Sequence, residues 1–331
     1  MPVPTHVAGA AGAFTDPLWR TRVRLNPVEV DLLRTEPVRR LQFVAHGGAS
    51  TLTTVQSYSR LEHSLGVLAL VAHFHPDDEL LRVAALLHDI GHLPLSHTFE
   101  GLAGLDHHAI GVRLTRSDPV RSVLGDHGMD AEAVVDRLGG QPPSPLTGRS
   151  GLLNLDHLDS YVRSGRSAGR LDVEPAALLS RVDVHDHAVS TDVETAAALV
   201  ALIRAEARLH TSWDNVGPTS VVRRLVGRLL DSAAVTPKSL ARMTDAQLWS
   251  ALDACPVTRE ESGRVRYAPH RLEVTAGAER GEYGGWGFSL RKIYSSAPLV
   301  HGQPLEDAAP AQAAELNALR HLPLTFLVRW A

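Results

Sequence analysis

The sequence predicts a mainly α-helical protein that opens with a short hairpin and closes with a small α+β region. Three observations carry this prediction. Residues 16–25 alternate polar and apolar side chains, as short strands do. From Asn26 to about Ala254 apolar residues recur mostly at helical spacing, and after Cys255 β-branched and aromatic runs stand between Gly and Pro breaks. The chain therefore divides into residues 1–25, 26–254 and 255–331.

Helical periodicity is strong in six segments of the central region, where apolar residues recur at i, i+3 and i+4. These segments are RLEHSLGVLALVAHF, DDELLRVAALLHDI, HHAIGVRLTR, DAEAVVDRL, LLNLDHLDSYVRS and TDVETAAALVALIRAEARLH. Asn26 and Pro27 form a typical helix start, and Pro218 predicts the start of another helix through residues 221–230. In the last region RVRYAPHRLEVTAG, GFSLRKIY and PLTFLVRW predict a small antiparallel sheet.

Composition excludes several classes of protein. With 331 residues, 44% hydrophobic and 21% charged residues, the chain is neither disordered, collagen-like nor a coiled coil. The single cysteine allows no internal disulfide, and the first residues lack the features of a signal peptide, so we expect a cytoplasmic protein. No apolar run approaches the ~20 residues of a membrane span. A net charge of −4 argues against nucleic-acid binding by bulk charge.

Histidine is unusually frequent, with 18 in the chain and eight of them between residues 63 and 108. The most informative stretch is LLRVAALLHDIGHLPLSHTFE, residues 80–100. It opens as an amphipathic helix that ends in two adjacent potential ligands, His88 and Asp89. Gly91 permits a turn, and Pro94 can start the next helix. The sequence therefore predicts a polar site at the junction of two apolar helices.

Further candidate ligands flank this stretch. His63 lies on an otherwise apolar helix face, and Asp156 and Asp159 lie three residues apart on one face of a later helix. A lone histidine on an apolar helix is a packed or surface residue in about nine cases of ten, and we interpret His73 and His75 in that way. The clustered residues need another explanation, because buried polar groups require partners. Imidazoles and carboxylates together suit Mn, Fe, Mg, Co or Zn.

At this point the chain resembles a known family. The segments RLEHSLGV and LLHDIGHLPLSHTFE resemble the HD-domain phosphohydrolases, and within them the deoxynucleoside triphosphate triphosphohydrolase branch. The likeness covers nearly the whole chain, because it begins with DPLWRTRVRLNPVEVDLLRTEPVRRLQFV, continues through NLDHLDSYVRSGR and reaches SLRKIYSSAPLVHGQPLEDAAP. It implies a helical HD-domain fold in residues 26–254.

The resemblance also implies roles for individual residues. One divalent transition metal per chain would be held by His63, His88, Asp89 and Asp156. The implied catalytic residues are His92, His97 and Glu100, with Glu100 orienting the His97 imidazole. Arg60 and His107 would bind the substrate's phosphates. Asp159 and Arg163 also fall within the implied substrate-binding set, with Asp159 bracing the site.

Several positions depart from the family's pattern. The family commonly carries a lysine, a tyrosine and an aspartate where this chain has His157, Ser160 and Ser164. It usually has glutamine, leucine and glycine near His46, which is the only polar candidate there. His46, His157 and Ser160 are therefore the residues expected to face the sugar or base. These changes affect the choice of substrate rather than the class of reaction.

The resulting expectation is a metal-dependent phosphohydrolase of nucleotides that releases nucleoside and triphosphate from a (deoxy)nucleoside triphosphate. The alternatives are a phosphatase for nucleoside monophosphates or modified nucleotides, and a nucleotide sensor without turnover. The complete ligand set argues against a sensor. The arginine-bearing segments LIRAEARLH and SVVRRLVGRLL leave nucleic-acid binding as a weaker alternative. The resemblance further implies a homo-oligomer and leaves room for an allosteric nucleotide.

Overall fold

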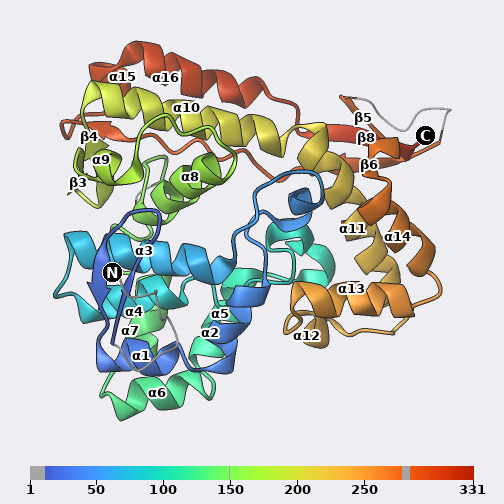
Figure 1. Cartoon of the computed structure of the whole chain (residues 1–331), viewed down its shortest axis with the longest axis horizontal. Coiled ribbons are helices and arrows are strands. Elements are labelled where there is room, and N and C mark those ends of the chain that lie inside the picture. The colour runs from blue at the N-terminus through green and yellow to red at the C-terminus, as the bar shows by residue number, and fades with distance from the viewer. Residues whose placement is uncertain (1–11, 149, 278–283) are drawn as a thin grey trace, which may run out of the picture.

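The computed structural model describes residues 12–148, 150–277 and 284–331 and is mainly helical, as predicted (Figure 1). The stretch in which we expected no signal peptide lies almost wholly outside the described residues. The expected N-terminal hairpin is present, since β1 (Ala13–Thr15) and β2 (Arg22–Arg24) pair antiparallel. In the part of the chain that the structure describes, no helix is both long and apolar enough to cross a membrane.

The six segments with strong helical periodicity all form helices. The helices up to residue 231 are α1 (Pro27–Leu32), α2 (Glu36–Arg40), α3 (Arg60–Phe74), α4 (Glu79–Leu87), α5 (His107–Thr115), α6 (Val120–Asp126), α7 (Ala131–Leu138), α8 (Leu155–Ser167), α9 (Pro175–Leu179), α10 (Val193–His210) and α11 (Trp213–Asp231). The later helices are α12 (Pro237–Leu240), α13 (Asp245–Ala254), α14 (Arg259–Tyr267), α15 (Leu305–Ala308) and α16 (Pro310–Asn317).

Helix α3 is central, because it packs between α4 and α8 (Figure 1). Its side chains belong to two separate hydrophobic clusters. Leu61 and Leu68 pack with the N-terminal hairpin and α4, whereas Val67 and Leu70 pack with α8 and α10. A helix that is apolar on nearly all faces is a buried helix. The polar His63 on α3 therefore lies in the interior, between two apolar cores.

Pro218 lies inside α11 rather than at its start, which corrects the prediction. Proline has no N–H, so the carbonyl of Asp214, one turn earlier, loses its helical partner. The Thr53 hydroxyl donates a hydrogen bond to that carbonyl at 2.6 Å. This contact from a different part of the chain lets the helix begin at Trp213, and no local sequence signal could reveal it.

Two small sheets complete the fold. Strands β5 (Leu272–Ala276), β8 (Thr325–Trp330) and β6 (Trp286–Ser289) form the antiparallel sheet expected near the C-terminus. The RVRY residues expected to start it belong instead to the end of α14. Strands β3 (Val182–His185), β4 (Ala188–Thr191) and β7 (Leu299–Val300) form a sheet that the sequence did not predict. The β3–β4 turn places Asp186 and His187 at positive φ without the glycine that usually signals such a turn.

Gly91 is required for packing rather than for its turn. Its φ is not positive. A Cβ at this position would overlap the His107 carbonyl oxygen and the backbone of Gly111, both on α5. Glycine at 91 therefore lets α5 approach the residues that follow α4, which brings their histidines together.

Replacement of Gly91 by alanine should lower the free energy of unfolding by about 1–3 kcal/mol or more, because backbone atoms must move to make room. Gly227→Ala is the matched control. Gly227 lies inside α11, where an added Cβ would meet nothing within 4 Å. That change should stabilise the protein by up to ~1 kcal/mol. Urea denaturation followed by circular dichroism measures both, and equal stability of the two variants would contradict the packing argument.

Candidate metal centre

Three helix ends bring the predicted metal ligands together. Helix α3 places His63 in its first turn. His88 and Asp89 follow directly after the last residue of α4. Helix α8 is capped by the Asn154 side chain, and Asp156 lies in its first turn. Each of the four side chains therefore lies within a helix or directly after one, which fixes its backbone position.

The ligand atoms lie at distances that suit one metal ion. His63 Nε2 is 3.0 Å from Asp156 Oδ1 and 3.3 Å from His88 Nε2. His88 Nε2 is 3.6 Å from Asp156 Oδ1 and 3.4 Å from Asp89 Oδ1. With metal–ligand bonds of about 2.0–2.2 Å, neighbouring ligand atoms on one ion stand roughly 3–3.6 Å apart. The residues present thus fit a bound cation.

Hydrogen bonds on the far side of each ring fix the orientation of both imidazoles. His63 Nδ1 lies 2.7 Å from Asp159 Oδ2, and His88 Nδ1 lies 2.7 Å from the Ala85 carbonyl oxygen. Because each Nδ1 donates to these acceptors, each Nε2 can direct a lone pair toward the centre. Metal-binding histidines are typically supported in this way.

The charges around His88 also favour a cation. Burial alone would lower the pKa of His88, yet Asp89 and Asp156 together raise it to about 9. Arg60 already pairs with one oxygen of Asp89, since its Nη1 lies 2.9 Å from Oδ2. The remaining negative charge faces the two imidazoles. A divalent ion of the kind that accepts nitrogen and oxygen ligands would neutralise it.

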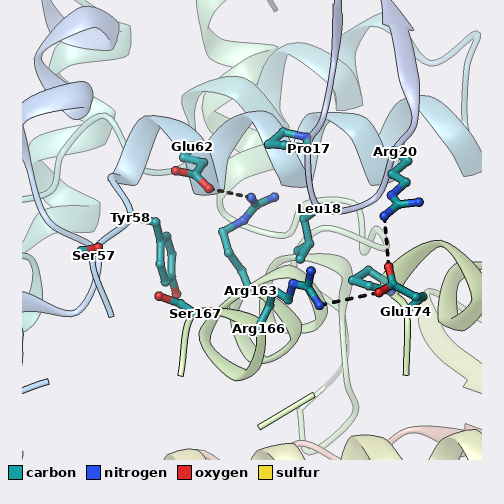
Figure 2. Close-up of a pocket in the computed structure, with 11 residues that line it drawn as sticks. Pro17, Leu18, Arg20, Ser57, Tyr58, Glu62, Arg163, Arg166, Ser167 and Glu174 are labelled. Carbon is teal, nitrogen blue, oxygen red and sulfur yellow. Dashed lines mark hydrogen bonds and ion pairs between the residues drawn. The ribbon is translucent and has the colours of Figure 1, made fainter. Parts of the chain in front are cut away.

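Asp159 and Arg163, which we expected among the substrate contacts, lie behind His63 instead. The Asp159 side chain has no exposed surface, and Arg163 pairs with it at 2.9 Å. Arg163 also pairs with Asp16 at 3.0 Å. Its pair with Glu62, at 3.1 Å, is drawn in Figure 2. Although burial would raise the pKa of Asp159, Arg163 and the hydrogen bond with His63 hold it at about 2. The ionised Asp159 therefore braces His63, the supporting role expected for it.

A second group of three imidazoles adjoins the first. The His92 and His107 rings stack with centroids 4.4 Å apart, and the His97 ring lies edge-on to both. The ligating atoms of these three residues lie within 4.8 Å of one another, close enough to hold an ion as well. His92 Nε2 is 3.1 Å from Asp89 Oδ1, so Asp89 contacts both groups. His92 Nδ1 is buried and has no hydrogen-bond partner among the residues that the structure describes.

The segment after His92 differs from the prediction. No α-helix follows Pro94, and residues 93–106 form two short 3₁₀ turns within a loop. The backbone passes through positive φ at Leu95 and Ser96, which ends any helical continuation. Glu100 consequently does not orient His97. Its Oε2 lies 2.7 Å from His107 Nδ1, so the carboxylate supports His107.

The predicted phosphate-binding Arg60 is buried beside Asp89. Its Nε donates to the Ser96 hydroxyl at 2.9 Å, its Nη1 to Asp89, and its Nη2 to the His46 carbonyl at 3.4 Å. All three nitrogens thus have protein partners. Arg60 fixes the position of Asp89 between the two imidazole groups.

His46 and Ser164 belong to one hydrogen-bonded network through Tyr58, a residue that the sequence did not single out. The Tyr58 hydroxyl lies 2.8 Å from His46 Nδ1 and 2.8 Å from Ser164 Oγ. The His46 ring stacks on Tyr58 and lies 4.7 Å from the His63 ring. His46 therefore flanks the metal centre, as a substrate-contacting residue would.

His157 and Ser160, the other two expected sugar-side residues, are half-buried on α8. His157 Nδ1 lies 3.5 Å from the Ser296 hydroxyl, and its ring lies 5.6 Å from the Tyr294 ring. Sequence reasoning did not assign Tyr294 to the site. It lies more than 130 residues further along the chain, so only the tertiary fold brings it here.

A separate pocket of about 280 Å³ is lined by Arg163, among other residues (Figure 2). Its charged side chains are already paired, because Arg163 contacts Glu62 and both Arg20 and Arg166 contact Glu174. It holds none of the candidate metal ligands. We therefore assign the chemistry to the metal centre rather than to this pocket.

Comparisons with known proteins agree with this geometry. The HD domain family model matches residues 60–184, which contain all four candidate ligands. The metal-dependent phosphohydrolase cns2 of Cordyceps militaris is 29% identical over 259 residues, 72% of each chain. The deoxynucleoside triphosphate triphosphohydrolase SAMHD1 of Xenopus laevis is 35% identical over 103 residues, which span 27% of this chain and 16% of that protein.

The likeness in structure extends over almost the whole chain. A crystal structure of a phosphohydrolase from Bacteroides thetaiotaomicron superposes with a TM-score of 0.74, covering 96% of this chain and 99% of that one at 16% identity. The C-terminal sheet is therefore part of a shared fold. Together with the HD domain matched in residues 60–184, the likeness to metal-dependent phosphohydrolases indicates that the chain is a hydrolase that carries an HD domain.

Proposed function

We propose that this phosphohydrolase acts on nucleoside triphosphates and releases nucleoside and intact triphosphate. The observation that carries the proposal is the row of three imidazoles next to the metal ligands, with Asp89 in contact with both groups. Such a row suits a reaction in which a phosphoryl group is held at the metal while a leaving oxygen takes up a proton. The match to SAMHD1 over 103 residues supports the choice of substrate.

We propose that His63, His88, Asp89 and Asp156 hold one divalent transition ion per chain. When bound, such an ion lowers the pKa of a water ligand and polarises a phosphoryl oxygen. Asp156 is the most accessible of the four, with 30% of its side chain exposed. The opening of the site toward solvent therefore lies on the Asp156 side.

The neighbouring histidines supply the proton chemistry. Burial, and Arg60 beside it, lower the pKa of His92, so this imidazole stays neutral and donates from Nε2 to Asp89. His97 is exposed at the rim and is the residue we assign to protonating the leaving oxygen. Glu100 fixes His107 with its Nδ1 as donor, which leaves His107 Nε2 free for a phosphoryl oxygen.

One alternative has its own support. The relative cns2, which matches 72% of this chain, is named only as a metal-dependent phosphohydrolase. The SAMHD1 match covers 27% of this chain. At His157, Ser160 and Ser164 this chain also departs from the triphosphohydrolase pattern. A phosphatase for monophosphates or modified nucleotides is therefore the second candidate, and the identity of the products decides between the two.

We also propose that the protein is a homo-oligomer, as the resemblance implies. Phe43 and Val55 are large apolar side chains that remain 59% and 74% exposed in the single chain. Burial of such side chains is what a subunit interface provides. Light scattering after size-exclusion chromatography measures the state directly, with and without nucleotide.

Replacement of a proposed ligand should remove the metal. We expect His88→Ala and Asp89→Ala each to lose most bound metal and activity, because a small site cannot replace a missing ligand. His73→Ala is the control, since His73 is exposed on the same helix as His63 but outside the site. Elemental analysis of purified protein gives the metal content. Full metal retention by both ligand variants would overturn the assignment.

Replacement of His97 should separate chemistry from metal binding. We expect His97→Ala to keep its metal and to lose about 10²-fold in turnover, the scale of a missing general acid. Glu100→Gln should lose less, because the amide oxygen still accepts from His107. The measurement is the turnover number alongside metal content. Loss of a second metal equivalent from His97→Ala would mean that the three-imidazole group binds metal.

The bond that breaks can be read from the products. In water enriched in ¹⁸O, attack at the α-phosphorus places the label in the released triphosphate and leaves the nucleoside unlabelled. We expect this result. We also expect the enzyme to discriminate less between ribose and deoxyribose, by about 1–3 kcal/mol for each lost sugar contact. Mass spectrometry of both products measures it. Release of phosphate or pyrophosphate from a triphosphate as first product would contradict the proposal, and turnover of monophosphates alone would favour the phosphatase.

A further inference from the structure

A segment from the C-terminal region contacts residues on two sides of the metal centre. We call residues 291–296, which follow β6, the strap. At one end Arg291 Nη1 lies 3.7 Å from Glu100 Oε1, beside the three-imidazole group. At the other end the Ser296 hydroxyl lies 3.5 Å from His157 Nδ1, next to Asp156. The strap therefore contacts Glu100 on the side of the three-imidazole group and His157 on the side of Asp156.

Tyr294 anchors the middle of the strap. Its half-buried ring lies 5.6 Å from the His157 ring and 6.5 Å from the His210 ring. Burial and then the charge of Asp156 raise the pKa of Tyr294, in keeping with a position near that carboxylate. The Lys292 ammonium lies 4.5 Å from the centre of the Tyr294 ring, a cation–π contact. Lys292 is thus held near the opening rather than extended freely into solvent.

The strap brings two positive charges near the metal centre, and only one of them has a carboxylate partner among the described residues. Lys292 has no carboxylate partner among the described residues. Arg291 is 69% exposed, and its contact with Glu100 is long, while Glu100 is already hydrogen-bonded to His107 at 2.7 Å. The chain has only two lysines among its 33 basic residues, Lys238 and Lys292. One of the two, Lys292, therefore lies in the strap, near the metal centre.

We propose that Arg291 and Lys292 bind the phosphates beyond the one that reacts, so that the strap selects a polyphosphate chain over a single phosphate. This inference rests on the proposed function, because it assumes that the reacting phosphoryl group lies at the metal centre. An ammonium on a flexible stem and an exposed guanidinium are suited to successive phosphate groups. A triphosphate carries more negative charge than a monophosphate, so it gains more from two extra cations.

The test measures the affinity of inorganic triphosphate and of inorganic phosphate for the metal-loaded protein by titration calorimetry. Lys292→Ala and Arg291→Ala should each weaken triphosphate binding about 10-fold, roughly one charge-assisted hydrogen bond, and change phosphate binding by less than about twofold. Lys292→Arg should keep most of the affinity. Lys238→Ala, in the exposed α12, is the matched control and should bind as the unmodified protein does. Triphosphate binding unchanged in both alanine variants would overturn the proposal.

Chemical labelling gives a second readout on the unaltered protein. Acetylation with an amine-selective reagent, followed by peptide mass spectrometry, should show Lys292 protected by triphosphate and Lys238 not protected. Equal labelling of Lys292 with and without triphosphate would count against the strap. Neither measurement depends on turnover. If nucleoside triphosphates are not hydrolysed, the proposed function fails while these results still decide the role of the strap.

Discussion

A buried chain of charges, running from Asp16 through Arg163 and Asp159 to His63, is the feature on which the metal centre depends. It joins the loop of the N-terminal hairpin to α8 and then to α3. Removing one member of such a chain leaves another charge buried and unpaired, which strongly destabilises the fold. The Trp19 indole also donates to Asp159, at 2.7 Å, and closes the chain from the hairpin side.

The close approach that this chain requires explains a glycine in α3. A Cβ at Gly66 would overlap the Arg163 guanidinium and the Asp159 carboxylate. Helices α3 and α8 can therefore bring His63 onto Asp159 only because position 66 has no side chain. The same reasoning applies to Gly91, where α5 approaches. Gly66 thus sets the separation of α3 and α8, Gly91 sets that of α5 and the segment after α4, and the distances between the candidate ligands depend on both.

Local pattern was enough to predict the helices, and it also marked the candidate metal ligands, which stay a prediction. His63 and His88 stood out because a polar group on an apolar helix face needs a partner, and helices α3, α4 and α8 all formed as expected. The motif resemblance then implied one shared metal ion for His63, His88, Asp89 and Asp156. Both kinds of signal are contained within single segments, so the primary structure displays them.

Contacts between distant segments could not be predicted in this way. The support of His107 by Glu100 depends on a loop with two residues at positive φ, where we expected a helix. The acceptance of Pro218 inside α11 depends on Thr53, 165 residues earlier in the chain. The strap begins more than 120 residues beyond the end of α8. In each case the deciding atom comes from a tertiary contact, for which a single sequence carries no local signal.

The sugar-side residues point to a shift in how this chain selects its substrate. Ser164 stands where the family commonly has an aspartate, and its hydroxyl is buried against the Tyr58 hydroxyl at 2.8 Å. A hydroxyl has one proton to donate, and a buried one committed to a neighbour offers little to a sugar. His157 faces Ser296 and Tyr294 from the strap. The residues that elsewhere would contact a sugar are thus committed to protein partners, while Arg291 and Lys292 of the strap lie near the metal centre, Lys292 with no carboxylate partner among the described residues. We therefore propose that recognition rests more on the phosphate end of the substrate than on its sugar, which is the physical reason for our assignment of Arg291 and Lys292.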